Sequence, residues 1–286
     1  MPTAPDGRQQ PNNASLGSQV TPVPVRAEPV TAEPVTAEPV ATEQVAAEPV
    51  TAEAARRVRR ALLTQHWLDL AFLHWPVDPD AVAPLLPAGT RPDQFGGTSY
   101  VGLIAFRMYR IGWLGLAGLP YLGSFPETNV RLYSVGPDGR RGVVFRSLEA
   151  ARLAPVVVAR LGFRLPYAWA RMTVDRRGDT LTYTSQRRWP GPRWATSRLT
   201  IRVGDPIPQP SDLELFLTAR WGLQATWHGQ KTFYLPNDHP RWSLYRARLL
   251  DLDENLVRAA GLPAPAGDPV SVLYSPGVPV RFGAPG

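Results

Sequence analysis

Hydrophobic and polar residues alternate along most of the chain in short segments, which is the pattern of β-strands. Clear examples span residues 64–77, 99–110 and 125–133. Roughly a dozen such segments follow one another, with a few short helical segments between them. A sheet of that size loses its exposed edges only when it closes on itself. The pattern therefore predicts a mainly β (α+β) fold, built as a closed or nearly closed antiparallel sheet.

Local signals mark the helices and turns between these strands. Asp78 precedes a proline and can cap a short helix, and Ser211 with Glu214 forms a capping box before a second one. A third helix is expected to open at Pro155. The sequence Ser-Pro-Gly-Val at 275–278 predicts a turn between the last two strands. Helices are thus expected only as short connections.

One strand, residues 125–133, carries a continuous polar row. Glu127, Asn129, Arg131 and Tyr133 occupy alternate positions, so their side chains share one face. Glu127 and Arg131 are about 13 Å apart between Cα atoms, so they would bracket a ligand instead of pairing directly. The row faces either an interior cavity or water, and the pattern alone leaves both readings open.

A Pro-Asp-Gly turn at 136–139 connects this strand to the next one, residues 142–150. Strict alternation predicts that Phe145, Ser147 and Glu149 lie on one face of that second strand. A second carboxylate is therefore expected to face the same side as the polar row.

Residues 1–53 differ in composition from the rest of the chain. From Arg26 onward they repeat a five-residue unit, Ala-Glu-Pro-Val-Thr, with proline in most copies. Regular proline prevents a continuous helix, and the unit has too little apolar bulk to offset the entropy of ordering. We expect a disordered acidic tail over 1–53, a short basic linker helix over 54–63 and a β-barrel domain over 64–286. The tail can act as a spacer or bind a partner.

The net charge of +7 is unevenly distributed. Residues 1–53 hold two arginines and seven acids, which leaves 29 basic and 17 acidic residues, or a charge of +12, on the remainder. The arginines are spread out and accompany no nucleic-acid-binding motif, so no nucleic-acid partner is expected. No stretch has the apolar length of a membrane span or of a signal peptide core. We therefore expect a cytoplasmic protein without a membrane partner.

Several kinds of chemistry are excluded or disfavoured. The chain has no cysteine, which excludes disulfides, thiolate catalysis and cysteine metal sites. His66 and His74 are expected on one strand face with Leu68, Leu70 and Phe72, but they stand roughly 26 Å apart and cannot share a metal ion. Phosphate-binding glycine loops and serine-nucleophile motifs are not visible either. We expect no metal and no cofactor.

The segments FPETNVRLY, LPYAWARM and LYSPGVPVRFG, with the stretch that begins VDPDAVAPLLP, resemble the YqjF-like family of uncharacterised bacterial proteins. That family is related to acetoacetate decarboxylase. The resemblance covers about residues 63–283, and FPETNVR is its most specific part. It implies an acetoacetate decarboxylase-like antiparallel β-barrel, cone-shaped, with a ligand cavity inside. The polar row is therefore expected to face that cavity.

The lysine with which acetoacetate decarboxylase forms a Schiff base has no counterpart here. The segment that corresponds, SLEAARLAP, contains Arg152, but a guanidinium stays protonated and is a poor nucleophile. Lys231 is the single lysine of the chain and is expected on the surface. Schiff-base decarboxylation is therefore not expected.

Glu127 and Glu149 are the candidate catalytic acids or bases, because burial can raise the pKa of a carboxyl group. The candidate substrate-binding residues are Asn129, Arg131, Ser147 and Tyr167. Two functions stay open: a lyase-like enzyme that acts on a small oxo-acid or carbonyl compound, and a non-catalytic ligand-binding or structural protein. A small-molecule ligand is the expected partner, and the sequence leaves the formation of a homo-oligomer open.

Overall fold

The computed structural model describes residues 45–113, 123–153, 156–157, 160, 165–227 and 231–286. The chain divides into two compact units, residues 1–43 and 44–286, and every described residue belongs to the second unit. Most of the expected tail lies outside the described residues, as does Pro155, which was expected to open a helix.

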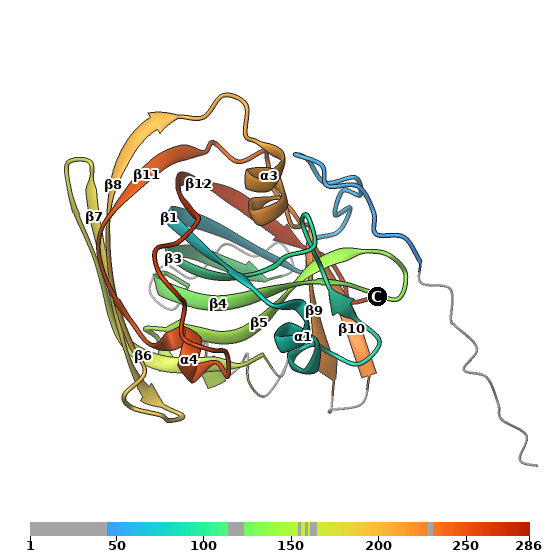
Figure 1. The fold of residues 1–286 in the computed structure, drawn as a ribbon, viewed down its shortest axis with the longest axis horizontal. Helices are drawn as coiled ribbons and strands as arrows, with labels where there is room; N and C mark the ends of the chain where they lie inside the picture. The colour runs from blue at the N-terminus through green and yellow to red at the C-terminus, as the bar shows by residue number, and fades with distance from the viewer. Residues whose placement is uncertain (1–44, 114–122, 154–155, 158–159, 161–164, 228–230) are drawn as a thin grey trace, which may run out of the picture. The chain divides into compact units, whose positions relative to one another are not determined.

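The described residues form twelve strands and a few short helices (Figure 1). The strands are β1 (Leu63–Val77), β2 (Arg91–Pro92), β3 (Ser99–Trp113), β4 (Phe125–Val135), β5 (Arg141–Ala150), β6 (Tyr167–Arg177), β7 (Thr180–Trp189), β8 (Thr196–Pro206), β9 (Gly222–Trp227), β10 (Lys231–Asp238), β11 (Tyr245–Glu254) and β12 (Ser271–Phe282). The helices are α1 (Pro79–Val82), the 3-10 turn η1 (Ala83–Leu85), α3 (Asp212–Thr218) and α4 (Leu256–Ala259). The fold is mainly β, as the alternation predicted.

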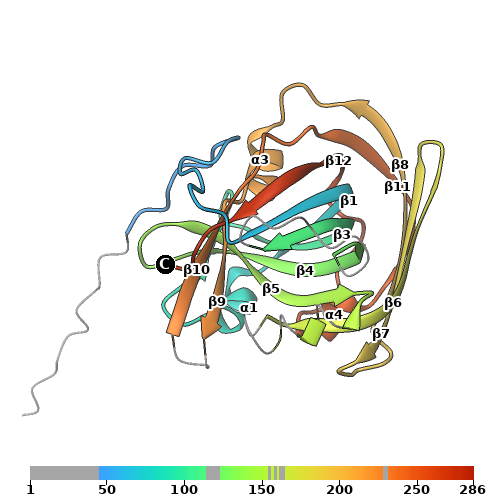
Figure 2. The ribbon, with the colours of Figure 1, turned by 180° about the vertical axis from the view of Figure 1, so that it is seen from behind.

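The sheet closes on itself twice. Nine strands form one ring in the order β5-β6-β7-β8-β11-β12-β1-β3-β4, because β4 also pairs with β5. Strands β9 and β10 bridge β5 and β12 and so close a second, smaller ring. Strands β12, β1, β3, β4 and β5 therefore form a wall shared by both rings, which Figures 1 and 2 show from opposite sides. The pairing is antiparallel except where β5 meets β6 and β9.

The shared wall is buried on both faces. Toward β9 and β10 it presents residues such as Phe72, Ile104 and Tyr133, which pack in one core cluster with Phe216 of α3. Toward β7 and β8 neighbouring positions such as Leu73, Leu103 and Leu132 pack in a second cluster. Since side chains alternate along a strand, each wall strand supplies both cores.

Register shifts in β5 and β1 change the face of the sheet on which some of their residues lie, compared with the prediction. In β5, Phe145 pairs with Arg131 and Ser147 pairs with Val130, so Arg146 is an extra residue in the ladder. A β-bulge of this kind reverses the alternation beyond it. Ser147 and Glu149 therefore do not share a face with Phe145, contrary to the prediction from strict alternation.

Strand β1 has a similar irregularity. Its register against β3 shifts between Leu68 and Ala71, next to Asp69, which has a positive φ of 50°. Trp67 and Leu70 consequently belong to the same core cluster, and the expected grouping of Leu68 with Leu70 is wrong. In both strands the alternation is correct only up to the bulge.

The predicted linker helix over 54–63 is also wrong. Residues 54–62 contain bends and no helix, and Ala54 and Val58 are buried. The Val58 N–H donates to the Asp238 carboxylate at 2.8 Å, so the segment makes tertiary hydrogen bonds in place of helical ones. Residues 45–53, expected in the disordered tail, are likewise part of the unit that contains the barrel.

The expected turn at 275–278 is absent, because β12 runs without interruption from Ser271 to Phe282. Gly277 instead has a φ of +130° and lies so close to β1 that a Cβ atom would be 2.1 Å from the Trp67 carbonyl oxygen. The glycine thus serves a close approach of two strands instead of a reversal.

The short-range helix signals are confirmed. The Asp78 side chain accepts from the Asp80 N–H at the start of α1, and Ser211 and Glu214 form both hydrogen bonds of the capping box of α3. Within the part of the chain that the structure describes, no helix has the length and apolar character needed to cross a membrane.

We predict that Gly277→Ala destabilises the barrel by about 3 kcal/mol or more, because the added methyl group collides with the backbone of β1 and the φ is unfavourable. The matched control is Gly178→Ala in the β6–β7 turn, where φ is +62° and no atom lies within 4 Å of the new methyl group. That change should cost only about 1–2 kcal/mol. Urea-induced unfolding measures both, and equal losses would contradict the close-approach explanation.

Candidate functional site

A cavity of about 320 Å³ lies on the side of the shared wall that faces β9. Its lining is mostly apolar and includes Phe72, Phe106, Phe125, Phe145, Trp242 and Phe282. Glu127, Asn129 and Arg131 of β4 also line it, together with Tyr167 of β6. A few polar groups in an apolar concave site are typical of small-molecule binding.

The structure therefore brings four of the six predicted site residues together. The alternation of β4 places Glu127, Asn129 and Arg131 on one face, as expected, and that face lines the cavity. Tyr167 reaches the same cavity from the start of β6. Their proposed roles in binding or catalysis remain predictions.

Glu127 is buried without an ion-pair partner among the described residues. The Tyr167 hydroxyl donates to its Oε2 at 3.1 Å. Burial raises the pKa of Glu127 to about 8, although hydrogen bonds from Tyr167 and Asn129 act in the opposite direction. The carboxyl group is therefore mainly protonated at neutral pH and can donate a hydrogen bond.

Arg131 is held from one side. Its Nε donates to the Tyr133 hydroxyl at 3.0 Å and its Nη2 donates to the Leu217 carbonyl at 2.8 Å. Within the described part of the chain its Nη1 has no hydrogen-bond acceptor, and Asn129 Oδ1 is buried with no donor. A ligand that fills the cavity can satisfy both atoms, and the buried Asn129 Oδ1 is otherwise an unfavourable feature of the site.

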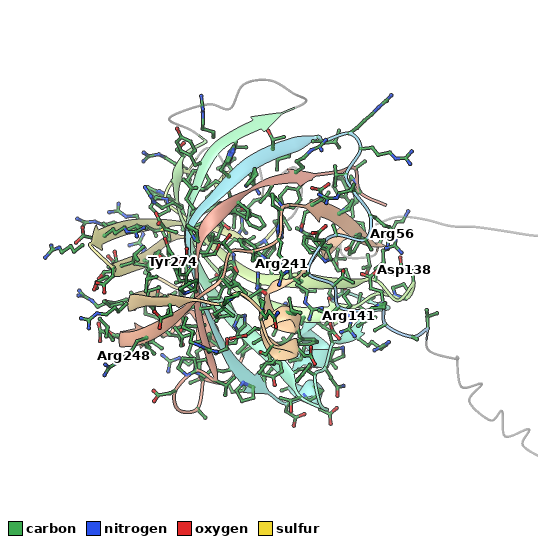
Figure 3. The ribbon with its side chains drawn as sticks, turned by 90° about the horizontal axis from the view of Figure 1, so that it is seen from above. Arg56, Asp138, Arg141, Arg241, Arg248 and Tyr274 are labelled. Carbon is green, nitrogen blue, oxygen red and sulfur yellow. The ribbon has the colours of Figure 1, made fainter. Side chains whose placement is uncertain are left out.

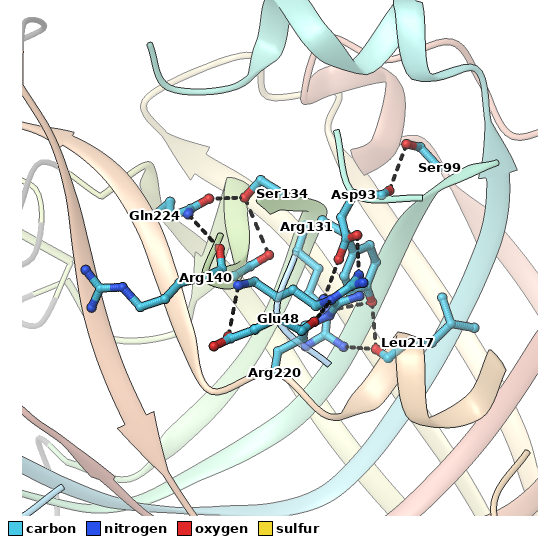
Figure 4. Close-up of polar contacts among 12 residues, drawn as sticks. Glu48, Asp93, Ser99, Arg131, Ser134, Arg140, Leu217, Arg220 and Gln224 are labelled. Atoms are coloured by element: carbon cyan, nitrogen blue, oxygen red, sulfur yellow. Dashed lines mark hydrogen bonds and ion pairs between the residues drawn. The ribbon is translucent and has the colours of Figure 1, made fainter. Parts of the chain in front are cut away.

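A polar network lies behind Arg131 (Figure 4). Asp93 accepts hydrogen bonds from Arg220, at 2.6 Å, and from Arg141. The Arg220 guanidinium also lies 4.8 Å from the centre of the Tyr133 ring, and the Tyr133 hydroxyl donates to the Leu217 carbonyl at 2.8 Å. This network fixes the rotamer of Tyr133 and thereby the orientation of Arg131.

Ser147 and Glu149 lie on the opposite face of the wall, beyond the bulge at Arg146. The Glu149 carboxylate accepts from Nε of Arg187 in β7 at 3.1 Å, and Ser147 Oγ accepts from its Nη2 at 2.9 Å. All three side chains are buried, and Arg187 bonds to both of the others. They form an ion-pair cluster and do not line this cavity. Arg187 was missed because its position in β7 gives no local signal of this pairing.

Lys231 is exposed and does not line the cavity, in agreement with the expectation of a surface residue. A Schiff base on this lysine inside the cavity is therefore incompatible with the structure. Among the described residues, no cluster of three or more histidine, aspartate or glutamate side chains has the geometry to hold a metal ion.

Comparison of the sequence identifies a family and a relative. The model of the family DUF2071, described as an uncharacterized conserved protein, matches residues 64–279. The uncharacterized protein YqjF of Bacillus subtilis (strain 168) is 30% identical over 211 residues, which are 73% of this chain and 86% of YqjF.

Solved structures agree on the fold. The enduracididine biosynthesis enzyme MppR complexed with pyruvate has a TM-score of 0.54 at 12% identity, over 82% of this chain and 91% of MppR. An acetoacetate decarboxylase has a TM-score of 0.53 at 13% identity, over 79% and 88% of the two chains. An acetoacetate decarboxylase-like enzyme from Sphingomonas wittichii RW1 has a TM-score of 0.51 at 13% identity, over 79% and 92%. The acetoacetate decarboxylase-like fold is thereby confirmed.

The contribution of Glu127 to stability is expected to depend on pH. Its pKa rises from an ordinary value of 4.5 to about 8 in the folded chain, so unfolding releases a proton between these pH values. This contribution is fully present below pH 4.5 and is lost as the pH rises through 8, by about 5 kcal/mol in total. Urea unfolding between about pH 5 and 8.5 should show the loss in the wild-type chain. The side chain in Glu127→Gln cannot titrate. If the free energy of unfolding of that variant depends on pH as strongly as that of the wild-type chain, the raised pKa does not belong to Glu127.

The Glu149–Arg187 cluster yields a separate prediction. Arg187→Met leaves a buried carboxylate without its partner and should cost about 3–5 kcal/mol. The double variant Glu149→Gln/Arg187→Met removes both charges, so it should recover much of that loss. Urea unfolding of both single variants and of the double variant gives the coupling free energy. Simple additivity would mean that the two groups do not form the buried pair.

Proposed function

Because this chain belongs to the DUF2071 family of uncharacterized conserved proteins, which shares its fold with acetoacetate decarboxylase, we propose that it binds a small oxo-acid or related carbonyl compound in the barrel cavity. One observation carries this proposal. Glu127, Asn129 and Arg131 converge in a cavity that is otherwise lined mainly by apolar side chains.

In this proposal Arg131 anchors the carboxylate of the ligand. Its Nη1 is the donor still without an acceptor, and Nε and Nη2 are already fixed to the protein, so little ordering is needed on binding. The aromatic lining then takes the apolar body of the ligand. Pyruvate, bound in the structure of the neighbour MppR, belongs to the same class of oxo-acids.

Glu127 is the second polar contact in this proposal. In its protonated form the carboxyl group adds no charge that would repel an anionic ligand, and it can donate to the ligand's carbonyl oxygen. Raising the pH above about 8 ionises Glu127 and should weaken binding.

The same arrangement supports a lyase-like reaction without a Schiff base. On a 3-oxo-acid the bond between the α-carbon and the carboxylate would break, carbon dioxide would leave, and the electron pair would move onto the carbonyl oxygen. Glu127 would protonate that oxygen to give the enol, and Tyr167 would hold the resulting Glu127 carboxylate. The raised pKa of Glu127 suits this role, because a general acid works best with a pKa near the working pH.

The test is a thermal-shift and calorimetry screen of the full chain against 2-oxo-acids and 3-oxo-acids with alkyl chains of increasing length. A true ligand at 100 times its dissociation constant should add about 2.7 kcal/mol of stability. Arg131→Met keeps the volume of the side chain but loses the donors, and should lose roughly tenfold or more in affinity. Nuclear magnetic resonance of the bound compounds then reports turnover.

Glu149→Gln is the matched control, because it changes a buried carboxylate on the other face of the same wall. It should lower stability without changing the affinity for the ligand. Undiminished binding to Arg131→Met would refute the anchor role, and a ligand that binds without turnover would leave the protein as a binding barrel.

A further inference from the structure

Residues 45–51, which contain one repeat unit at 46–50, are held against the barrel by hydrogen bonds to residues far away in the sequence. We call the surface they contact, formed by Arg91, Gly139, Arg141 and Trp221, the docking groove. Figure 3 shows Arg141 on this side of the molecule, near Asp138 and Arg56.

Backbone hydrogen bonds hold the docked unit along its length. The Glu48 N–H donates to the Gly139 carbonyl at 2.9 Å, and the Glu48 carbonyl accepts from Arg141 Nε at 2.6 Å. The carbonyl of Val45 accepts from Arg91 at 3.0 Å, and that of Thr51 accepts from the Trp221 indole at 3.1 Å. Any extended segment without proline at the glutamate position can make these bonds.

Two side chains of the unit add selectivity. Glu48 Oε1 accepts from the backbone N–H of Arg141 at 3.0 Å, and Val50 packs against the core cluster on the β9 side. Glu48 is also paired with Arg56 at 3.2 Å, but Arg56 is 72% exposed, so this pair contributes little. The groove therefore recognises a glutamate followed two positions later by a valine.

The same spacing recurs upstream of the docked unit. Glutamate and valine stand two positions apart in the units at 26–30, 31–35, 36–40 and 41–45. Proline lies between them in the first three of these units, as it does at Pro49 of the docked one. Every group that the groove contacts within a unit is thus present in the other copies.

We propose that the docking groove is a recognition site for this repeat unit, and that its partner is the repeat array of a second copy of the chain. Each chain carries one groove and several equivalent units. Replacement of one unit by an identical one reproduces the contacts of the docked segment, which is the condition for exchange between subunits. The chain's own unit has the advantage of a high effective concentration, so exchange grows with protein concentration.

The test removes the competing unit. In an acceptor variant of the full chain each repeat glutamate becomes glutamine and each repeat valine becomes serine, at Glu28, Glu33, Glu38, Glu43, Glu48, Val30, Val35, Val40, Val45 and Val50. Fluorescently labelled acceptor should sediment faster when unlabelled wild-type chain is added. Acceptor mixed with unlabelled acceptor is the matched control and should show no change. If wild-type chain leaves the sedimentation unchanged, the proposal is wrong.

A peptide experiment keeps the proposal testable if the acceptor variant does not fold. A synthetic peptide of residues 31–41, TAEPVTAEPVA, is titrated into the wild-type chain, where it must compete with the docked unit. We expect saturable binding that is about tenfold weaker when both glutamates of the peptide are glutamine, because a charge-assisted hydrogen bond is lost. Equal affinity of the two peptides, or no binding, would overturn the assignment of the groove.

Discussion

Burial of the five shared strands on both faces is the constraint on which the rest of the structure depends. A polar side chain on such a wall cannot reach bulk water on either side, so it must be paired within the protein or line a cavity. Glu127 and Glu149 illustrate the two outcomes. Glu149 faces Arg187 and is ion-paired, whereas the polar partners of Glu127 within the described residues are the Tyr167 hydroxyl and the Asn129 amide, and Glu127 is mainly protonated at neutral pH. The chemistry of each carboxyl group thus follows from the face on which it lies.

A single residue decides that face. Without the bulge at Arg146, Ser147 and Glu149 would continue the row begun by Phe145 and would enter the cavity. The carboxyl group of Glu149 would then add a second acid to the site. With the bulge, β5 contributes Phe145 and Leu148 to the cavity and its polar residues to the opposite core. The bulge therefore separates an apolar binding site from a buried ion pair within one strand.

The sequence was sufficient to predict the β-rich fold. It also predicted that Glu127, Asn129 and Arg131 share one face, because period-two alternation holds throughout β4. It was insufficient to predict which residues share a face in β1 and β5, because a bulge depends on pairing with a neighbouring strand and leaves no reliable signal in the local sequence. The expected helix over 54–63 failed for a related reason: Val58 bonds to Asp238, a contact across the fold. The glycine at 277 was read as a turn, but its role is to admit the backbone of β1.

The charges around the polar network connect the cavity with the docking groove. Arg131, Arg141 and Arg220 lie in one chain of contacts through Tyr133 and Asp93, and neighbouring His74 is kept neutral because burial and the arginines lower its pKa. Asp93 is the carboxylate that pairs with Arg141 and Arg220, whereas the carboxylate of the docked Glu48 accepts from the Arg141 backbone N–H and pairs with Arg56. One guanidinium, Arg131, is left without a counter-charge in this network, and it is the one that faces the cavity. An anionic ligand at Arg131 would supply that counter-charge, so the electrostatics of this network support the proposed binding of an oxo-acid in the cavity.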